Sequence, residues 1–389
     1  MTRASDLHVL LAGGGSGGHV FPALAVGEEL SARGCAVSFA GAAGGMEARL
    51  VPQRGIPFHP LRARPLVGVG WAGKVRALAT LALSSLGGAR LLRRLGVRVV
   101  LGTGGYVSAP AVLGARLLRR PALLLEPNAR AGLANRQLGR FASGAAVAFP
   151  RAARDLACPV RTTGVPVRRE FFDVPEEPEG DGLRLLVLGG SQGARSLNLA
   201  VVGALLGSDG GARGGAGLLE RRPELTVVHQ TGAALLDETR EAYARGGVLG
   251  EGNGWGRLRV VPFIDDVAGA MGRSHLVVSR AGAITVAEIA AAGRASVLVP
   301  LALAEGHQAD NARALDEAGA ARTVSEVPAG SDGEGGPDDL PGALASCLDE
   351  LLADRSRLRE MAGAARALAR RDAASAIADW IVELGGGAA

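Results

Sequence analysis

Short apolar runs alternate with amphipathic segments along the whole chain. The runs are predicted strands at 8–12, 36–40, 97–101, 122–125, 183–188, 225–229, 258–261, 275–279 and 296–299. Helical periodicity is found at 22–33, 72–95, 110–119, 196–206, 233–244, 284–292 and 355–384. Mostly apolar runs such as 122–125 are typical of parallel strands buried on both faces. The pattern therefore predicts an α/β fold with two doubly wound parallel sheets.

The stretch 173–182 is acidic, rich in Pro and Gly, and without periodicity, so it predicts a linker between two domains. A length of 389 residues also suits two domains. We place the boundary between Gly164 and Gly182, and expect one Rossmann-like domain over 1–165 and a second over 166–389. The sequence leaves open whether the last helix packs back on the first domain.

The chain has a net charge of +5, and its basic residues are nearly all arginine, with Lys74 the only lysine. An anionic partner and a compositional bias explain this balance equally well. We do not expect a nucleic-acid partner, because the basic residues are not interleaved with aromatic ones and no recognition motif is present.

The three cysteines, Cys35, Cys158 and Cys347, have neither CxxC nor Cys/His spacing, so we expect isolated thiols in a reducing compartment. The first residues do not resemble a signal peptide, and there is no uncharged apolar run of about 18 residues. These features favour a cytoplasmic protein and leave association with a membrane surface open.

Each half of the chain opens with a strand that ends in a glycine-rich turn and leads into a helix. The turn at 13–19 (GGGSGGH) follows the strand 8–12, and the turn at 189–195 (GGSQGAR) follows the strand 183–188. Unpaired backbone N–H groups at such a turn, together with the helix dipole, bind phosphate groups. Two such turns favour a phosphorylated ligand.

The first turn also matches GxGxxG, which keeps an NAD-type oxidoreductase as an alternative. That fold has an acidic residue at the end of the second strand to bind ribose. Here the second strand runs into glycines, and the first carboxylate is Glu47. A P-loop is excluded, because no GK[ST] occurs.

Several polar residues follow predicted strands or begin predicted helices. His19 lies at a helix N-terminus, where the dipole disfavours imidazolium, so it is either a neutral base or a capping histidine. The turn 102–106 and the segment Glu126-Pro127-Asn128 end neighbouring strands, where open α/β sheets bind ligands. Glu288, one turn into a helix, could accept hydrogen bonds from a ribose diol or only complement the dipole.

Gln308 and Asn311, which follow Pro300, could contact a sugar or be surface amides. There is no Asp-x-Asp pattern, the kind of carboxylate cluster that would hold a divalent cation on a diphosphate. We therefore expect no metal and no cofactor.

One further segment has an apolar stripe that ends in arginines. Helical spacing relates Trp71, Val75, Leu78, Ala82 and Leu86, and the arginines Arg90, Arg93, Arg94, Arg98, Arg116, Arg119 and Arg120 follow. The segment is either a pair of core helices with solvated arginines or an apolar patch that rests on anionic lipid headgroups.

The order of long motifs between Val9 and Ala321 is more specific than any of these features. The motifs are GGGSGGHVFPALAVGEEL at 13–30, GTGGYVSAP at 102–110, EPNARAGLANR at 126–136, GVPVR at 164–168, GGSQGARSLN at 189–198, SRAGAITVAEIAAAG at 279–293 and PLALAEGHQADNA at 300–312. Together they resemble the MurG family, the N-acetylglucosaminyltransferases that convert lipid I to lipid II in bacterial peptidoglycan synthesis.

The resemblance implies a GT-B architecture, with two Rossmann-like domains facing across a cleft. The second domain would bind UDP-N-acetylglucosamine, and the first would bind the lipid-linked acceptor. It further implies an inverting transfer to the 4-hydroxyl of the N-acetylmuramoyl sugar, catalysed by a peripheral enzyme at the cytoplasmic face of the membrane.

By position in the motifs, the resemblance implies donor contacts from Ser16, Gly17, Gly18, Asn128, Arg168, Ser191, Ile264, Ala283, Ile284, Thr285, Val286, Ala287, Glu288 and Gln308. Glu288 would hold the ribose, the backbone of Ile264 the uracil, and Gln308 the sugar. His19 is the candidate for activating the acceptor hydroxyl, and Glu126 is the alternative.

This chain departs from the family pattern at Ser16, where Thr is usual, and at Leu125-Glu126-Pro127-Asn128, where His-Glu-Gln-Asn is usual. A run usually rich in Asp, Arg and Gln is here 304–307, Ala-Glu-Gly-His. A GT-B enzyme with a soluble or antibiotic-type acceptor and a non-catalytic member of the fold stay open as alternatives.

Overall fold

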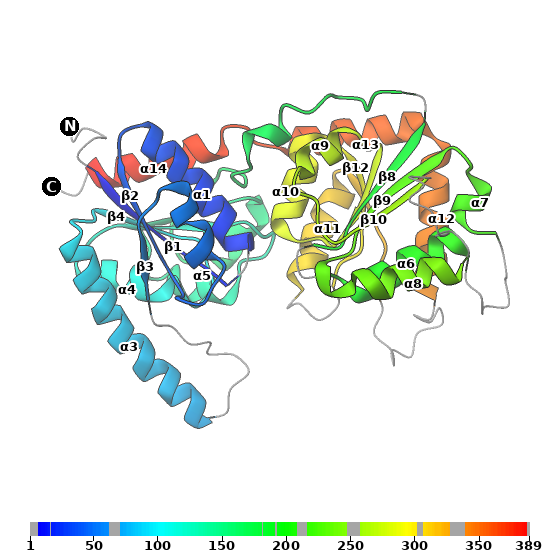
Figure 1. The fold of residues 1–389 in the computed structure, drawn as a ribbon. Coiled ribbons are helices and arrows are strands. Elements are labelled where there is room, and N and C mark those ends of the chain that lie inside the picture. The colour runs from blue at the N-terminus through cyan, green and yellow to red at the C-terminus, as the bar shows by residue number, and fades with distance from the viewer. Residues whose placement is uncertain are drawn as a thin grey trace. The chain divides into compact units, whose positions relative to one another are not determined.

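The structure, a computed structural model, describes residues 7–15, 17–61, 71–180, 182–190, 193–207, 216–246, 257–301, 306–326 and 339–386; for residues 71–75, 77 and 78 it describes only the backbone. The chain forms two compact units, residues 1–167 with 370–389 (unit 1) and residues 168–369 (unit 2) (Figure 1). Each unit contains one sheet with helices packed on it, and all strand pairs are parallel. The expected α/β fold class is confirmed.

In its described residues, unit 1 has a seven-stranded sheet in the order β3-β2-β1-β4-β5-β6-β7. The strands are β1 (His8–Ala12), β2 (Ala36–Gly41), β3 (Phe58–Pro60), β4 (Val99–Gly102), β5 (Ala122–Glu126), β6 (Gly144–Val147) and β7 (Val160–Thr162). The helices are α1 (Gly17–Ala32), α2 (Glu47–Leu50), α3 (Trp71–Arg94), α4 (Ala109–Leu117), α5 (Leu133–Leu138) and α14 (Ala373–Gly386).

Unit 2 has, across its described residues, a six-stranded sheet in the order β10-β9-β8-β11-β12-β13. The strands are β8 (Leu183–Leu188), β9 (Leu225–Gln230), β10 (Leu258–Val261), β11 (Leu276–Ser279), β12 (Ala295–Leu298) and β13 (Ala321–Thr323). The helices are α6 (Arg195–Leu206), α7 (Leu218–Arg221), α8 (Leu236–Arg245), α9 (Val267–Gly272), α10 (Ala283–Ala292), α11 (His307–Glu317), α12 (Leu340–Ala353) and α13 (Arg355–Leu368).

In each sheet the strand numbers rise outward in both directions from one point, where the strand order reverses. This point lies between β1 and β4 in unit 1 and between β8 and β11 in unit 2. Ala12 pairs with Gly102 across the first reversal, and Leu188 pairs with Ser279 across the second. In open α/β sheets, ligands bind beyond the carboxyl ends of the strands at this reversal. Each unit therefore has one position where its chemistry is expected, and a glycine turn leaves the sheet at each.

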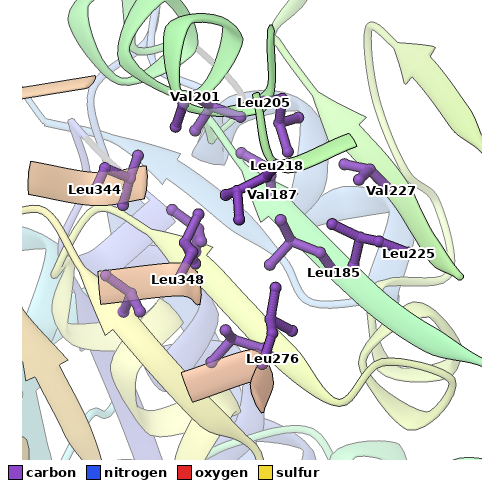
Figure 2. Close-up of a cluster of buried hydrophobic side chains, with 14 of the residues drawn as sticks. Leu185, Val187, Val201, Leu205, Leu218, Leu225, Val227, Leu276, Leu344 and Leu348 are labelled. Atoms are coloured by element: carbon purple, nitrogen blue, oxygen red, sulfur yellow. The ribbon is translucent and has the colours of Figure 1, made fainter. Parts of the chain in front are cut away.

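The strands are held by apolar side chains that alternate between the two faces of a sheet. In unit 2, Leu185 and Val187 of β8 are at most 1% exposed and belong to one cluster with helix residues Val201, Leu344 and Leu348 (Figure 2). Burial of each such side chain contributes about 1.5–3 kcal/mol. These contacts fix the position of β8 in unit 2. They therefore also fix the position of the glycine turn that follows β8.

The expected last helix over 355–384 is two helices, α13 and α14, because Ala369 has an extended backbone and the polar residues 370–372 interrupt the apolar periodicity. Ile377, Trp380 and Ile381 of α14 are buried in the core of unit 1. The expected range 166–389 for the second domain therefore includes a helix that belongs to the first unit.

We predict that Trp380→Ala lowers the free energy of unfolding of unit 1 by about 3–5 kcal/mol, the usual cost of truncating a buried aromatic side chain. The ring is 4% exposed, and it lies so close to Gly144 that a Cβ there would be 2.4 Å from it. Urea unfolding followed by circular dichroism measures the change. Leu368→Ala, at a 41% exposed position of α13, is the control and should change stability by less than about 1 kcal/mol. An unchanged midpoint for Trp380→Ala would show that α14 is not part of this core.

Candidate functional site

The two loops at the reversal of the unit 1 sheet are joined by hydrogen bonds. Thr103, directly after β4, donates its N–H to the Ala12 carbonyl oxygen at 2.9 Å and its hydroxyl to the His19 carbonyl oxygen at 2.8 Å. A Cβ at Gly13 would lie 2.0 Å from the Thr103 hydroxyl oxygen, so glycine is required at this contact. The glycine turn and the loop after β4 thus form one packed structure.

His19 is the third residue of α1, and its ring lies against the loop after β4. Its Nδ1 atom is 2.7 Å from the Thr103 carbonyl oxygen. Because a carbonyl only accepts hydrogen bonds, Nδ1 must carry the proton, which leaves the lone pair on Nε2. Cβ atoms at Gly104 and Gly105 would lie 2.9 Å and 3.5 Å from the ring, at backbone φ angles of +96° and +71°. Glycines at these two positions therefore leave room for the His19 ring against this loop.

Burial lowers the pKa of His19 below its ordinary 6.5. The hydrogen bond to Thr103 and the negative charges of Glu126 and Glu47 oppose this shift without cancelling it. At neutral pH the ring is therefore uncharged, with a basic Nε2 atom, as a general base requires.

Glu126, at the end of β5, is 2% exposed and saturated with hydrogen bonds. Its Oε1 atom accepts from the backbone N–H and the side-chain amide of Asn128, each at 3.0 Å. Its Oε2 atom accepts from the Gly132 N–H and the Asn135 amide, each at 2.9 Å. These four donors order the loop 126–135 around the carboxylate. The arrangement favours a structural role for Glu126 and leaves His19 as the better base.

Three other expected contact residues of unit 1 lie near these loops. Gly17 and Gly18 are the first residues of α1, and Asn128 is held by Glu126. Ser16 lies outside the described residues.

In unit 2, the second glycine turn leaves β8 beside the loop that follows β11. A Cβ at Gly189 would lie 2.7 Å from the Gln230 carbonyl oxygen, and Gly193 has a φ of +78°, so both positions require glycine. Arg280 donates to the Ser196 hydroxyl at 2.6 Å and to Glu326 at 2.8 Å, which ties the loop after β11 to α6. Ser191 lies outside the described residues.

The loop after β11 leads into α10, whose N-terminus begins at Gly282 with no side-chain cap. The first N–H groups of such a helix have no intrahelical partner and carry positive potential. Among the expected contact residues, Ala283 and Val286 have buried side chains, so they could contact a ligand only through the backbone. Ile284, Thr285, Ala287 and Glu288 are partly exposed.

Glu288 faces Arg168, the first residue of unit 2, with 3.6 Å between a carboxylate oxygen and a guanidinium nitrogen. Arg168 also pairs with Glu170 at 2.8 Å and lies 4.9 Å from the centroid of the Phe171 ring. Burial raises the pKa of Glu288 to about 7, although the charge of Arg168 acts in the opposite direction. The structure thus brings together two expected contact residues that are 120 positions apart in the sequence.

The remaining expected residues of unit 2 lie on neighbouring loops. Ile264 is half-buried between β10 and α9. Gln308, in the first turn of α11, accepts a hydrogen bond from the Leu301 N–H at 3.0 Å through Oε1. Asn311 is fully buried and donates to the Ala281 carbonyl oxygen at 3.1 Å, so it holds the loop after β11 and is not a surface amide.

Sequence reasoning missed the residues that hold these loops, namely Thr103, Asn135, Arg280 and the buried Glu47. Each lies within or beside a glycine-rich motif, but their partners are 5 to 91 positions away, so no single local pattern identifies them. Glu47 accepts one hydrogen bond from Gly15 of the first glycine turn and one from Ala42, and it is 0% exposed, so its carboxylate is not available to a dinucleotide ribose. This weighs against the oxidoreductase alternative. Within the described residues, no group of three or more His, Cys, Asp and Glu side chains could hold a metal ion.

Comparison with known proteins places these features in a family. The chain matches the glycosyltransferase family 28 N-terminal domain over residues 9–147 and the family 28 C-terminal domain over residues 184–377. A relative from Sorangium cellulosum is 43% identical over 97% of this chain and 88% of its own length. It is named a UDP-N-acetylglucosamine–N-acetylmuramyl-(pentapeptide) pyrophosphoryl-undecaprenol N-acetylglucosamine transferase. A relative of the same name from Syntrophotalea carbinolica is 40% identical over 95% of this chain and 97% of its own.

The crystal structure of Acinetobacter baumannii MurG has a TM-score of 0.75 and 33% identity, and the match covers 97% of this chain and 99% of that one. The two matched domains correspond to the two parallel sheets, as in a GT-B glycosyltransferase. The family inferred from the motifs is therefore confirmed: this chain is a glycosyltransferase of family 28 and belongs, within it, to the MurG family.

Proposed function

We propose that the protein transfers N-acetylglucosamine from UDP-N-acetylglucosamine to the 4-hydroxyl of the N-acetylmuramoyl sugar of lipid I, with inversion, to form lipid II. The names of relatives at 40% and 43% identity over nearly the whole chain support this pair of substrates. The fixed tautomer of His19 is the observation that carries the mechanism, because it leaves a basic nitrogen at a glycine turn.

In this mechanism unit 2 binds the donor. The uncapped N–H groups of α10 and the guanidinium of Arg168 receive the charge that develops on the diphosphate as the bond from C1 to the phosphate oxygen breaks. Glu288 accepts hydrogen bonds from the ribose hydroxyls, the backbone of Ile264 binds uracil, and Gln308 contacts the sugar. Asn128, Gly17, Gly18, Ser16 and Ser191 complete the contact set that the motifs imply.

Unit 1 binds the acceptor. Its hydroxyl oxygen attacks C1 of the donor sugar, and its proton passes to Nε2 of His19 while UDP leaves. The carbonyl of Thr103 stabilises the imidazolium that forms, because it already accepts from Nδ1. Glu126 keeps the neighbouring loop in place.

We further propose that the enzyme is peripheral at the cytoplasmic face of the membrane and binds anionic lipid through α3. Leu83 and Leu86 of α3 are 71% and 49% exposed, which does not fit a core helix. Arg90, Arg93 and Arg94 are exposed near the end of the same helix, and a groove of about 570 Å³ runs between it and β3. Figure 1 shows α3 extending away from the rest of unit 1.

The side chains of Trp71, Val75 and Leu78, which the sequence placed on the same stripe, lie outside the described residues, and Ala82 is exposed. In the part of the chain that the structure describes, no helix has both the length and the hydropathy needed to span a bilayer.

Replacing His19 with alanine should lower kcat by about 10²- to 10⁴-fold, the usual contribution of a positioned base. Affinity for UDP-N-acetylglucosamine should change little, because His19 is not among the proposed donor contacts. Radiolabelled donor and lipid I measure turnover, and His59→Ala in β3 is the control. For the unchanged enzyme, kcat/KM for the acceptor should fall only below pH 6.5, because burial lowers the pKa of His19 and keeps it unprotonated above that pH. Wild-type turnover by His19→Ala would exclude His19 as the base.

Binding of UDP-N-acetylglucosamine should weaken as the pH falls below about 7, approaching tenfold per pH unit, because protonation removes the charge of Glu288. The intact donor is the right probe, since its diphosphate is esterified at both ends and does not titrate in this range. Glu288→Gln should bind about 10- to 100-fold more weakly, with no pH dependence between 6 and 8. Glu170→Gln, which also removes a partner of Arg168, should keep the pH dependence. A pH profile unaltered by Glu288→Gln would remove the ribose assignment.

Vesicles that contain phosphatidylglycerol test the membrane proposal by co-sedimentation. The double change Leu83→Glu and Leu86→Glu should weaken binding at least about tenfold, since two apolar contacts are lost and two negative charges added. Turnover of a water-soluble acceptor analogue should not change. Leu368→Glu, on an exposed position of unit 2, should bind vesicles as the unchanged enzyme does. Equal sedimentation of the α3 variant and the unchanged enzyme would contradict the assignment of this surface.

A further inference from the structure

The two faces of the unit 2 sheet are covered unequally at β9 and β10. On one face, Val227 and Val260 are buried in the core that includes residues of α6, α8 and α12 (Figure 1). On the other face, Thr226 and Arg259 of the same strands are exposed, and Val228 is only half-buried. Parallel sheets are normally covered by helices on both faces. The second face is therefore open where this kind of fold usually has a helix.

The short helix between β10 and β11 explains the opening. This helix, α9, has six residues, whereas α8 in the preceding connection has ten. At 1.5 Å per residue, α9 is only about 9 Å long, too short to cover two strands. A groove of about 890 Å³ remains, lined in part by Val228 and Arg259 of the sheet and by Val174 and Pro175 of the linker.

Opposite charges lie toward opposite ends of this groove. Arg184, the second residue of β8, and Arg273, three residues before β11, lie toward the amino ends of the strands, where they outnumber Glu179 of the linker. Asp265 and Asp266 follow the carboxyl end of β10. Arg273 also approaches Asp266 to 4.0 Å, but the two side chains are 66% and 68% exposed, and such a pair contributes little. The groove thus has a positive end and a negative end.

These charges match the dipole of a helix in one orientation. A helix on a parallel sheet runs antiparallel to the strands, because it leaves the carboxyl end of one strand and returns to the amino end of the next. Its positive N-terminus then lies at the carboxyl ends of the strands, and its negative C-terminus at their amino ends. In this groove the N-terminus would meet Asp265 and Asp266, and the C-terminus would meet Arg184 and Arg273.

We propose that this groove of unit 2 binds an amphipathic helix of a partner protein. The helix places small apolar residues against Val228 and carboxylates of its last turn near Arg184, Arg259 and Arg273. The six residues of β9 span about 20 Å, which about 13 helical residues also span. The proposal does not depend on the proposed reaction.

Two synthetic helices of this length test the charge pattern. Both are stapled, labelled with a fluorophore and apolar on one face, and their last turn contains either glutamates or lysines. The glutamate helix should bind the unchanged enzyme at least about tenfold more tightly in fluorescence anisotropy. The double variant Arg259→Glu and Arg273→Glu should prefer the lysine helix. Equal affinities of the two helices for the unchanged enzyme would overturn the proposal.

The controls separate the groove from charge in general and from the donor site. Arg357→Glu, at an exposed position of α13, should keep the preference for the glutamate helix. Loss of the preference in this variant as well would mean that the binding is not local to the groove. Ile264 lines the groove and is a proposed donor contact, so it is left unchanged, and KM for the donor should stay within twofold in the double variant. If the double variant does not fold, Arg273→Glu alone should reduce the preference.

Photo-cross-linking tests the orientation of the helix. A benzophenone at the first residue of the glutamate helix should label the segment that contains Asp265 and Asp266. A benzophenone at its last residue should label residues next to Arg184. Mass spectrometry of the cross-linked peptides locates the labels, and a reversed pattern or labels outside the groove would contradict the proposal.

Sedimentation velocity distinguishes a partner helix from a second copy of this chain. The unchanged enzyme and the double variant should sediment as the same species at the concentrations used for binding. Self-association that the double variant abolishes would assign the groove to a second copy and refute the proposal.

Discussion

The hydrogen bond from His19 to the Thr103 carbonyl depends on the parallel pairing of β1 with β4, and most of the chemistry proposed for unit 1 depends on that bond. Ala12 lies opposite Gly102, so the residues that follow each strand emerge side by side. A shift of the register by one residue would carry Thr103 to the other face of the sheet. The tautomer of His19 would then be undetermined. The position of the proposed base is thus fixed by the apolar strands and not by the loop alone.

The same topology in unit 2 produces a different electrostatic result. Both reversals present a glycine turn and a helix N-terminus, yet the carboxylate of Glu47 is buried at the first and the neutral His229 near the second. Two similar turns are therefore packed on different buried polar groups, a difference that the glycine motifs alone do not reveal.

The sequence predicts the strands well where apolar runs are long, because β1, β5 and β8 are buried on both faces. The edge strands β3, β7 and β13 have three residues each, too few for a period to appear, and were not predicted. The break between α13 and α14 was missed, because the polar residues 370–372 are too short an interruption to separate two strongly helical segments in the sequence. The reversal points follow from strand order, which periodicity does not give.

The candidate site residues, like the strands, were only partly predictable from the sequence. Motif position identified His19, Glu126 and Glu288, but only the fold separates their roles. Glu126 has four donors around it, whereas Glu288 is partly buried beside one arginine, and its pKa is raised to about 7. A carboxylate whose hydrogen bonds are complete has little to gain from a ligand, because new partners would have to displace existing ones. A carboxylate that burial keeps partly protonated gains from hydroxyl donors, since they stabilise its charged form. The different completeness of their hydrogen bonding therefore explains how one acidic residue holds a loop while another is suited to hold a ribose.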